Sequence, residues 1–143
     1  MAKASRSVVI TSTIAALLLL GSAPAKSSGV EMKPLEQTIL EEDANAATNE
    51  HVMLRCMGLY SMFVQILPSQ YKELGEKHRL LAQAFAAAAI ESGANSDYTL
   101  TQGKIIIEAY NDRWQAAKAA TGSGSDDPVI KSDAATCKRL AGG

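Results

Sequence analysis

The densest group of potential metal ligands lies within residues 51–57, where His51, Met53, Cys56 and Met57 occur together. Imidazole and thioether groups are ligands that suit copper ions. If the segment is helical, Met53 and Met57 share one face because they are four residues apart, whereas His51 lies on another. One ion could not readily bind all three, and methionines also serve as adaptable core or interface residues. We therefore expect no resident metal and keep these three as candidate ligands.

His78, the second histidine, lies on an apolar stripe of a predicted helix and is also a candidate metal ligand. A helical bundle can hold haem between one His and one Met, which makes His78 with Met57 or Met62 the pair to consider. The chain has no C-x-x-C-H motif for haem attachment. A histidine on an inner helix face is more often a hydrogen-bonded core residue, so we expect no cofactor.

No combination of residues predicts catalysis. The chain has no G-x-S-x-G motif, and neither cysteine lies at a predicted helix N-terminus that would activate a thiolate. Carboxylates occur in pairs at helical spacing, as in Glu73 with Glu76 and Glu108 with Asp112. Basic side chains interleave with these pairs, which is typical of a solvated helix face. We therefore predict that the protein is not an enzyme.

The two cysteines, Cys56 and Cys137, are most simply explained as one disulfide bond. The alternatives are two free thiols, a redox pair or metal ligands. A redox pair normally has C-x-x-C spacing, and a structural zinc site needs four clustered ligands. The chain has neither pattern. For so long a loop, the chain-entropy estimate gives a disulfide about 4–5 kcal/mol of stabilisation.

The first 25 residues have the pattern of a secretory signal peptide. Lys3 and Arg6 precede an apolar run over residues 8–20, and small residues in an A-x-A pattern end at Ala25. The run is shorter than the roughly 20 residues that span a bilayer, which argues against the alternative of an uncleaved anchor. We therefore predict a periplasmic or secreted protein, in a compartment that favours disulfide formation.

Apolar residues recur at helical spacing along the rest of the chain, and no strand-type alternation occurs. Pro68 and Gly93 would end the first two helices. Thr99 and Gln102 match a capping box that would start the third, and Asp127–Pro128 would start the last. The expected helices are residues 49–67, 70–92, 99–121 and a short one from about residue 127 that carries Cys137.

These elements predict an all-α fold, a small up-down bundle of three main helices plus a short C-terminal helix tied to the first by the disulfide. We expect residues 1–25 to be the signal peptide, 26–47 a flexible N-terminal arm and 48–143 the helical domain. The Gly-Ser-Gly-Ser stretch at residues 122–125 is expected to be a flexible hinge.

The few large aromatic side chains are the remaining candidates for a binding surface. Tyr60 and Phe63 lie on the first predicted helix, and Tyr110 and Trp114 lie one turn apart on the third. One interpretation is that they are the main anchors of a core otherwise rich in alanine. The other is that part of the stripe remains exposed as a groove for a partner or ligand.

The charge balance narrows the class of partner. The chain has 14 basic and 15 acidic residues and no clustered basic face, which argues against a nucleic-acid binder. No polybasic helix predicts membrane binding once the signal is removed. The sequence favours a non-enzymatic exported protein that contacts an envelope protein, as an accessory subunit, chaperone or inhibitor. The alternative is a carrier of a small molecule, haem or metal in the bundle core.

Overall fold

The computed structural model describes residues 31–41 and 46–143, and every regular element in these ranges is helical. The all-α prediction is confirmed. The signal peptide predicted for residues 1–25 lies outside the described residues. None of the described helices is long and apolar enough to cross a membrane. The elements are α1 (Leu35–Glu41), α2 (Ala46–Ile66), α3 (Lys72–Glu91), α4 (Ser96–Thr121), the 3-10 turn η1 (Gly124–Asp126) and α5 (Pro128–Leu140).

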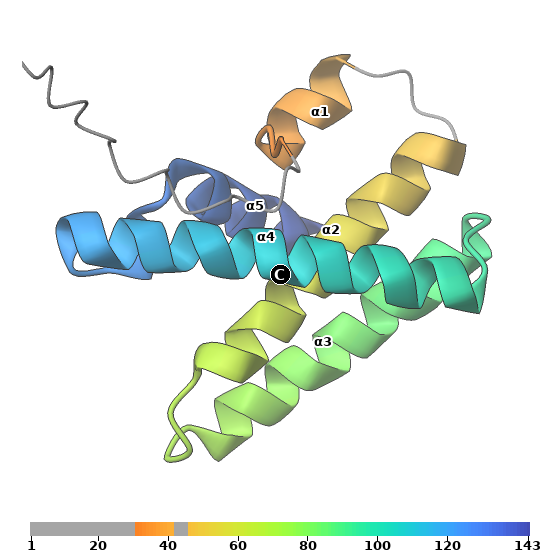
Figure 1. Ribbon diagram of the computed structural model, residues 1–143. Helices are drawn as coiled ribbons and strands as arrows, with labels where there is room; N and C mark the ends of the chain where they lie inside the picture. The colour runs from red at the N-terminus through yellow and green to blue at the C-terminus, as the bar shows by residue number, and fades with distance from the viewer. Residues whose placement is uncertain (1–30, 42–45) are drawn as a thin grey trace, which may run out of the picture.

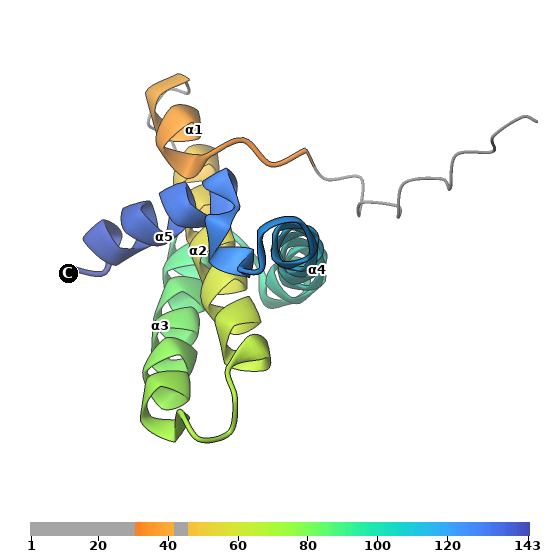
Figure 2. The same ribbon diagram turned by 90° about the vertical axis from the view of Figure 1, so that its left-hand side faces the viewer.

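Helix α2 is the centre of the molecule. It forms an antiparallel hairpin with α3, and α4 lies across it rather than alongside, so that Figure 2 shows α4 almost end-on while α2 and α3 run vertically. Helices α1 and α5 pack against α2 and against each other near its N-terminal half (Figure 1). Because neighbours surround α2, its residues 54–60 are all buried. This explains why its sequence is apolar on nearly every side.

Two glycines allow α2 and α4 to cross closely. A Cβ atom added at Gly58 of α2 would overlap the side chain of Ile106 in α4. A Cβ added at Gly103 of α4 would lie 2.6 Å from Cε of Met57 in α2. The crossing is therefore built from glycine on each helix facing a larger apolar residue on the other.

The disulfide between Cys56 and Cys137 is confirmed. It links α2 to α5 across a sequence separation of 81 residues, with the two Cα atoms 5.5 Å apart. The predicted start of α5 is also confirmed. Asp127 caps the helix by accepting hydrogen bonds from the amides of Val129 and Ile130, and Pro128 occupies the first turn.

Two local predictions were wrong. Helix α4 begins at Ser96, because Asn95 rather than Thr99 caps it and accepts a hydrogen bond from the Tyr98 amide. The Thr99 hydroxyl instead donates to the backbone oxygen of Asn95. The Gly-Ser-Gly-Ser stretch is not an open hinge: its last two residues begin η1, and Gly124 is buried beneath the Trp114 ring.

The segment expected to be a flexible arm is also packed where the structure describes it. Met32 and Leu35 are buried in the core, and residues 35–41 form α1. The residues from Ala46 onward already belong to α2. Residues 26–30 and 42–45 of the predicted arm lie outside the described ranges.

The glycines at positions 58 and 75 should respond oppositely to alanine. Both lie within helices, where alanine is favoured over glycine by about 0.5–1 kcal/mol. Nothing lies within 4 Å of a Cβ added at Gly75, so Gly75→Ala should raise the free energy of unfolding by that amount. Gly58→Ala should lower it by about 1–3 kcal/mol, because the β-branched Ile106 side chain cannot move aside without shifting α4.

Urea unfolding of the two variants beside the parent protein measures this difference. A Gly58→Ala midpoint at or above that of the parent would contradict the close crossing of α2 and α4.

Candidate functional site

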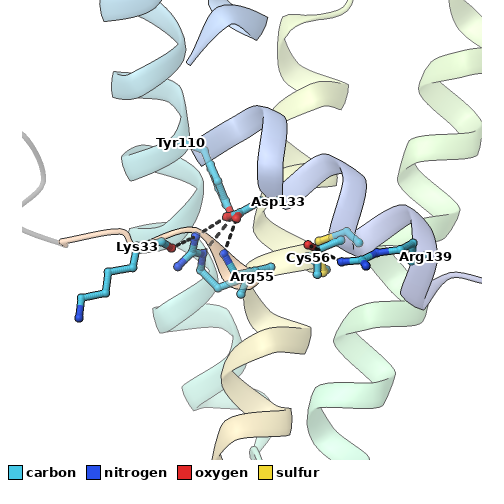
Figure 3. The surroundings of a disulfide bond; sticks show 9 residues. Lys33, Arg55, Cys56, Tyr110, Asp133 and Arg139 are labelled. Carbon is cyan, nitrogen blue, oxygen red and sulfur yellow. Dashed lines mark hydrogen bonds and ion pairs between the residues drawn. A yellow bond between two sulfur atoms is a disulfide. The ribbon is translucent and has the colours of Figure 1, made fainter. Parts of the chain in front are cut away.

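A buried ion pair joins α2 to α5. Nη2 of Arg55 donates to Oδ2 of Asp133, and the two side chains are only 3% and 0% exposed (Figure 3). Removing two charges from water costs several kcal/mol for each ion unless further hydrogen bonds satisfy the remaining polar atoms. The structure therefore requires additional partners for both groups.

Tyr110 of α4 supplies one of these partners. Its hydroxyl accepts a hydrogen bond from Nε of Arg55 at 2.9 Å and donates one to Oδ2 of Asp133. Burial, reinforced by the Asp133 carboxylate, raises the pKa of Tyr110 far above its usual value. The phenol therefore stays protonated, which lets it donate to the carboxylate and accept from the guanidinium at the same time.

The backbone at the start of α1 supplies the remaining partners. The amide of Leu35 donates to Oδ1 of Asp133 at 2.7 Å, and Nη2 of Arg55 donates to the backbone oxygen of Lys33 at 2.9 Å. Figure 3 shows Arg55, Tyr110 and Asp133 converging beside the backbone of Lys33. We call these three side chains the clamp. It fastens the start of α1 to three helices that follow it in the sequence.

The side chains of the fastened segment reinforce the clamp. Leu35 is completely buried, and Met32 and Thr38 are nearly so. The Thr38 hydroxyl donates to the backbone oxygen of Pro34, which closes the first turn of α1. Helix α1 is therefore fixed by both backbone hydrogen bonds and apolar burial, although it has only seven residues.

Two apolar side chains of α1 remain exposed: Leu40 lies opposite the buried Leu35, and Ile39, four residues after Leu35, borders the buried side. Leu40 is 81% exposed and Ile39 is 42% exposed. We call these two side chains the α1 face. Polar and charged residues border them: Lys33 pairs with Glu41 at 3.5 Å, and Nε2 of Gln37 donates to Oε1 of Glu41 at 2.5 Å. An apolar centre with a polar border resembles the organisation of a protein–protein contact surface.

A polar hollow of about 210 Å³ lies beside α1. Its lining carries both signs of charge, so it has no net preference for a charged ligand. Arg55 of the clamp lines the hollow, as do Lys33 and Thr38 of the segment that the clamp holds. The lining residues are Glu31, Lys33, Thr38, Glu41, His51 and Arg55.

The four predicted aromatic residues do not form one exposed surface. Tyr110 is completely buried in the clamp and Tyr60 is buried against Phe85, so of the two interpretations these tyrosines fit that of core anchors and not that of an exposed groove. Phe63 and Trp114 are half-buried, with ring centroids 6.2 Å apart. The chain has too few large apolar side chains to leave the tyrosine rings outside its core.

The candidate metal ligands lie in separate environments. His51 lines the polar hollow, and Met57 packs against Gly103 at the crossing of α2 and α4. His78 lies against Tyr60 and Phe63, with centroid distances of 5.5 and 5.4 Å. Met53 is partly buried against the core. Among the described residues, no group of three or more His, Cys, Asp or Glu side chains could hold a metal ion.

The sequence analysis missed Arg55 and Asp133, although both left a signal. Arg55 is the only charged residue between Val52 and Leu67, within a run that is otherwise mostly apolar. Asp133 falls at a helical repeat with Val129, Ile130 and Cys137. A charge at a core position of one helix requires an opposite charge elsewhere in the core, so two such positions predict a pair.

Neutralising Asp133 should strongly destabilise the protein. In Asp133→Asn the shape is retained, but the buried Arg55 loses its counter-charge. Breaking a buried pair in this way costs about 3–5 kcal/mol. Urea unfolding should show this loss, whereas the exposed Asp112→Asn should stay within about 0.5 kcal/mol of the parent. Equal stability of the two variants would show that the ion pair does not hold the fold.

His78 should make stability depend on pH. Its Nδ1 is buried with no hydrogen-bond partner among the described residues. Burial, with a smaller contribution from Lys77, lowers the pKa of its imidazole. In the unfolded chain this imidazole has a pKa of about 6.5. As pH falls below that value, the unfolded chain binds a proton more readily than the folded chain, so the free energy of unfolding decreases.

The urea midpoint should therefore fall between pH 7.5 and pH 5.5, and fall less in His78→Leu. Both proteins retain His51, so any effect of the other histidine on the pH profile is common to the two. Identical pH profiles would contradict this role of His78.

The comparisons with known proteins found no relative of this chain. No protein-family model, curated protein or solved structure matches the chain. The assignment of a function therefore depends on the clamp and the surfaces that it positions.

Proposed function

We propose that this chain is a non-enzymatic, exported helical protein that acts through protein–protein contact. Its partner is an envelope protein, toward which it serves as an accessory subunit, chaperone or inhibitor. The α1 face is the proposed contact surface. The signal-peptide pattern and the single long-range disulfide support a periplasmic or secreted location.

One observation carries the proposal: the fold fixes a short helix through its inward side while Leu40 and Ile39 remain exposed. A seven-residue helix is not stable alone in water, because nucleation is unfavourable at this length. The clamp supplies two hydrogen bonds to the segment, one buried and one partly buried, and Leu35 supplies an anchor in the core. Attachment of α1 uses only its inward side, so the exposed Leu40 and Ile39 are available for contact with another protein.

The arrangement also limits the entropic cost of association. A contact surface on a mobile segment must lose conformational freedom when the partner binds. The clamp removes that freedom in advance, because Leu35 and Lys33 are already fixed at the first turn of α1. The α1 face is therefore preorganised for binding.

A carrier of a ligand in the bundle core is the alternative function. The unpartnered Nδ1 of His78 and the half-buried Phe63 and Trp114 favour it. An absorption spectrum and metal analysis of protein purified from its own host distinguish the two functions. A Soret band or stoichiometric copper would support the carrier, and a colourless, metal-free protein would support contact through α1.

Photocrosslinking tests the proposed surface. A photoreactive phenylalanine replacing Leu40 should form a discrete adduct with an envelope protein in the native host. The same group replacing Leu100, which is 65% exposed on α4, should not form that adduct. Ile39→Glu in the Leu40-labelled chain should abolish the adduct, because a charge would be buried in the contact.

Adducts of equal yield at positions 40 and 100, or an adduct insensitive to Ile39→Glu, would contradict the α1 face as the contact surface. An adduct at twice the mass of the chain would identify a second copy instead of an envelope partner.

A further inference from the structure

The disulfide and the clamp connect the same two helices at neighbouring positions. Arg55 and Cys56 are consecutive in α2, while Asp133 and Cys137 are one turn apart in α5. Arg55 forms the ion pair with Asp133, and Cys56 forms the disulfide with Cys137. Figure 3 shows the two connections side by side. The covalent bond therefore lies within one helical turn of the carboxylate that holds α1.

We propose that the Cys56–Cys137 disulfide controls the docking of residues 31–41. In the oxidised protein α5 is fixed to α2, so Asp133 is available to Arg55 and to the Leu35 amide. Reduction by a dithiol releases α5, and the segment that depends on Asp133 is released with it. This inference rests on the proposed function in one respect only: if the α1 face binds a partner, the disulfide regulates that binding.

The redox step is an ordinary thiol–disulfide exchange. A thiolate of the dithiol attacks one sulfur of the Cys56–Cys137 bond, which breaks the bond, releases the other cysteine as a thiolate and leaves a mixed disulfide between the reagent and the attacked cysteine. The second thiol of the reagent then attacks the reagent's own sulfur in the mixed disulfide and releases the remaining cysteine as a thiolate. The dithiol becomes a disulfide, and the protein gains two electrons and two protons as two thiols. Both cysteines are completely buried, so attack requires local opening of α5 first.

The dependence of α1 on α5 follows from its hydrogen bonds. Oδ1 of Asp133 is the acceptor for the Leu35 amide. If α5 leaves, that amide loses its acceptor and Arg55 loses its buried counter-charge. A buried guanidinium without a counter-charge moves toward water, and its hydrogen bond to the Lys33 oxygen is then lost as well.

The rest of the fold has contacts that do not pass through α5. The crossing of α2 and α4 is formed by Gly58 against Ile106 and by Gly103 against Met57. The hairpin of α2 and α3 includes the stacked rings of Tyr60 and Phe85, 5.8 Å apart. Reduction should therefore open α1 and α5 locally and leave the three long helices assembled.

Hydrogen exchange of the full chain, followed by mass spectrometry, tests the proposal. After treatment with dithiothreitol under native conditions, peptides within residues 31–41 and 128–140 should exchange at least tenfold faster than in the oxidised protein. Peptides within residues 72–91 should change less than twofold. The double variant Cys56→Ser, Cys137→Ser should reproduce the reduced pattern without reagent and should not respond to dithiothreitol.

A second variant separates the clamp from the bond. In oxidised Asp133→Asn, residues 31–41 should exchange faster while residues 128–140, still tethered by the disulfide, change less. Unchanged protection of residues 31–41 after complete reduction would overturn the proposal, as would equal loss of protection in all helices. Neither readout involves a partner, so failure of the Leu40 crosslink would overturn the proposed function and leave redox control standing.

Discussion

The carboxylate of Asp133 is the group on which the arrangement of this protein depends. It accepts hydrogen bonds from the Arg55 guanidinium, the Tyr110 hydroxyl and the Leu35 amide, and these belong to three different segments. A buried carboxylate is tolerated only when such donors surround it. The start of α1 and helices α2, α4 and α5 therefore meet at this one carboxylate, although they are far apart in the sequence.

The clamp gives a specificity that apolar packing does not supply by itself. Small side chains let helices approach closely, as Gly58 and Gly103 do where α2 crosses α4, but they bury little area and define the register weakly. Buried charge is a poor source of net stability but disfavours arrangements in which it is unpaired. In this protein, apolar packing and the disulfide stabilise the fold, and the clamp determines where α1 and α5 attach.

The sequence predicted the features that arise from local chemistry. Helical periodicity identified α2 to α5, Asp127–Pro128 marked the start of α5, and an even pair of cysteines in an exported-type chain indicated the disulfide. The errors came where tertiary contacts compete with local signals. Asn95 caps α4 in place of Thr99, and the ring of Trp114 orders a stretch whose composition suggests flexibility. Docking of the 31–41 segment depends on Asp133, about a hundred positions away, which no local pattern could reveal.

The ion pair between Arg55 and Asp133 also has a consequence for how this sequence can diverge. Replacing either residue alone leaves the other charge buried without a partner, whereas replacing both by apolar residues of similar volume removes the penalty. Substitutions of Arg55 and Asp133 should therefore occur together in evolution. Once both have changed, the Tyr110 hydroxyl no longer has the two hydrogen bonds that require a tyrosine at this position. Sequences that diverge from this one should carry either all three residues of the clamp or apolar residues in their place, and selection should act against intermediate combinations.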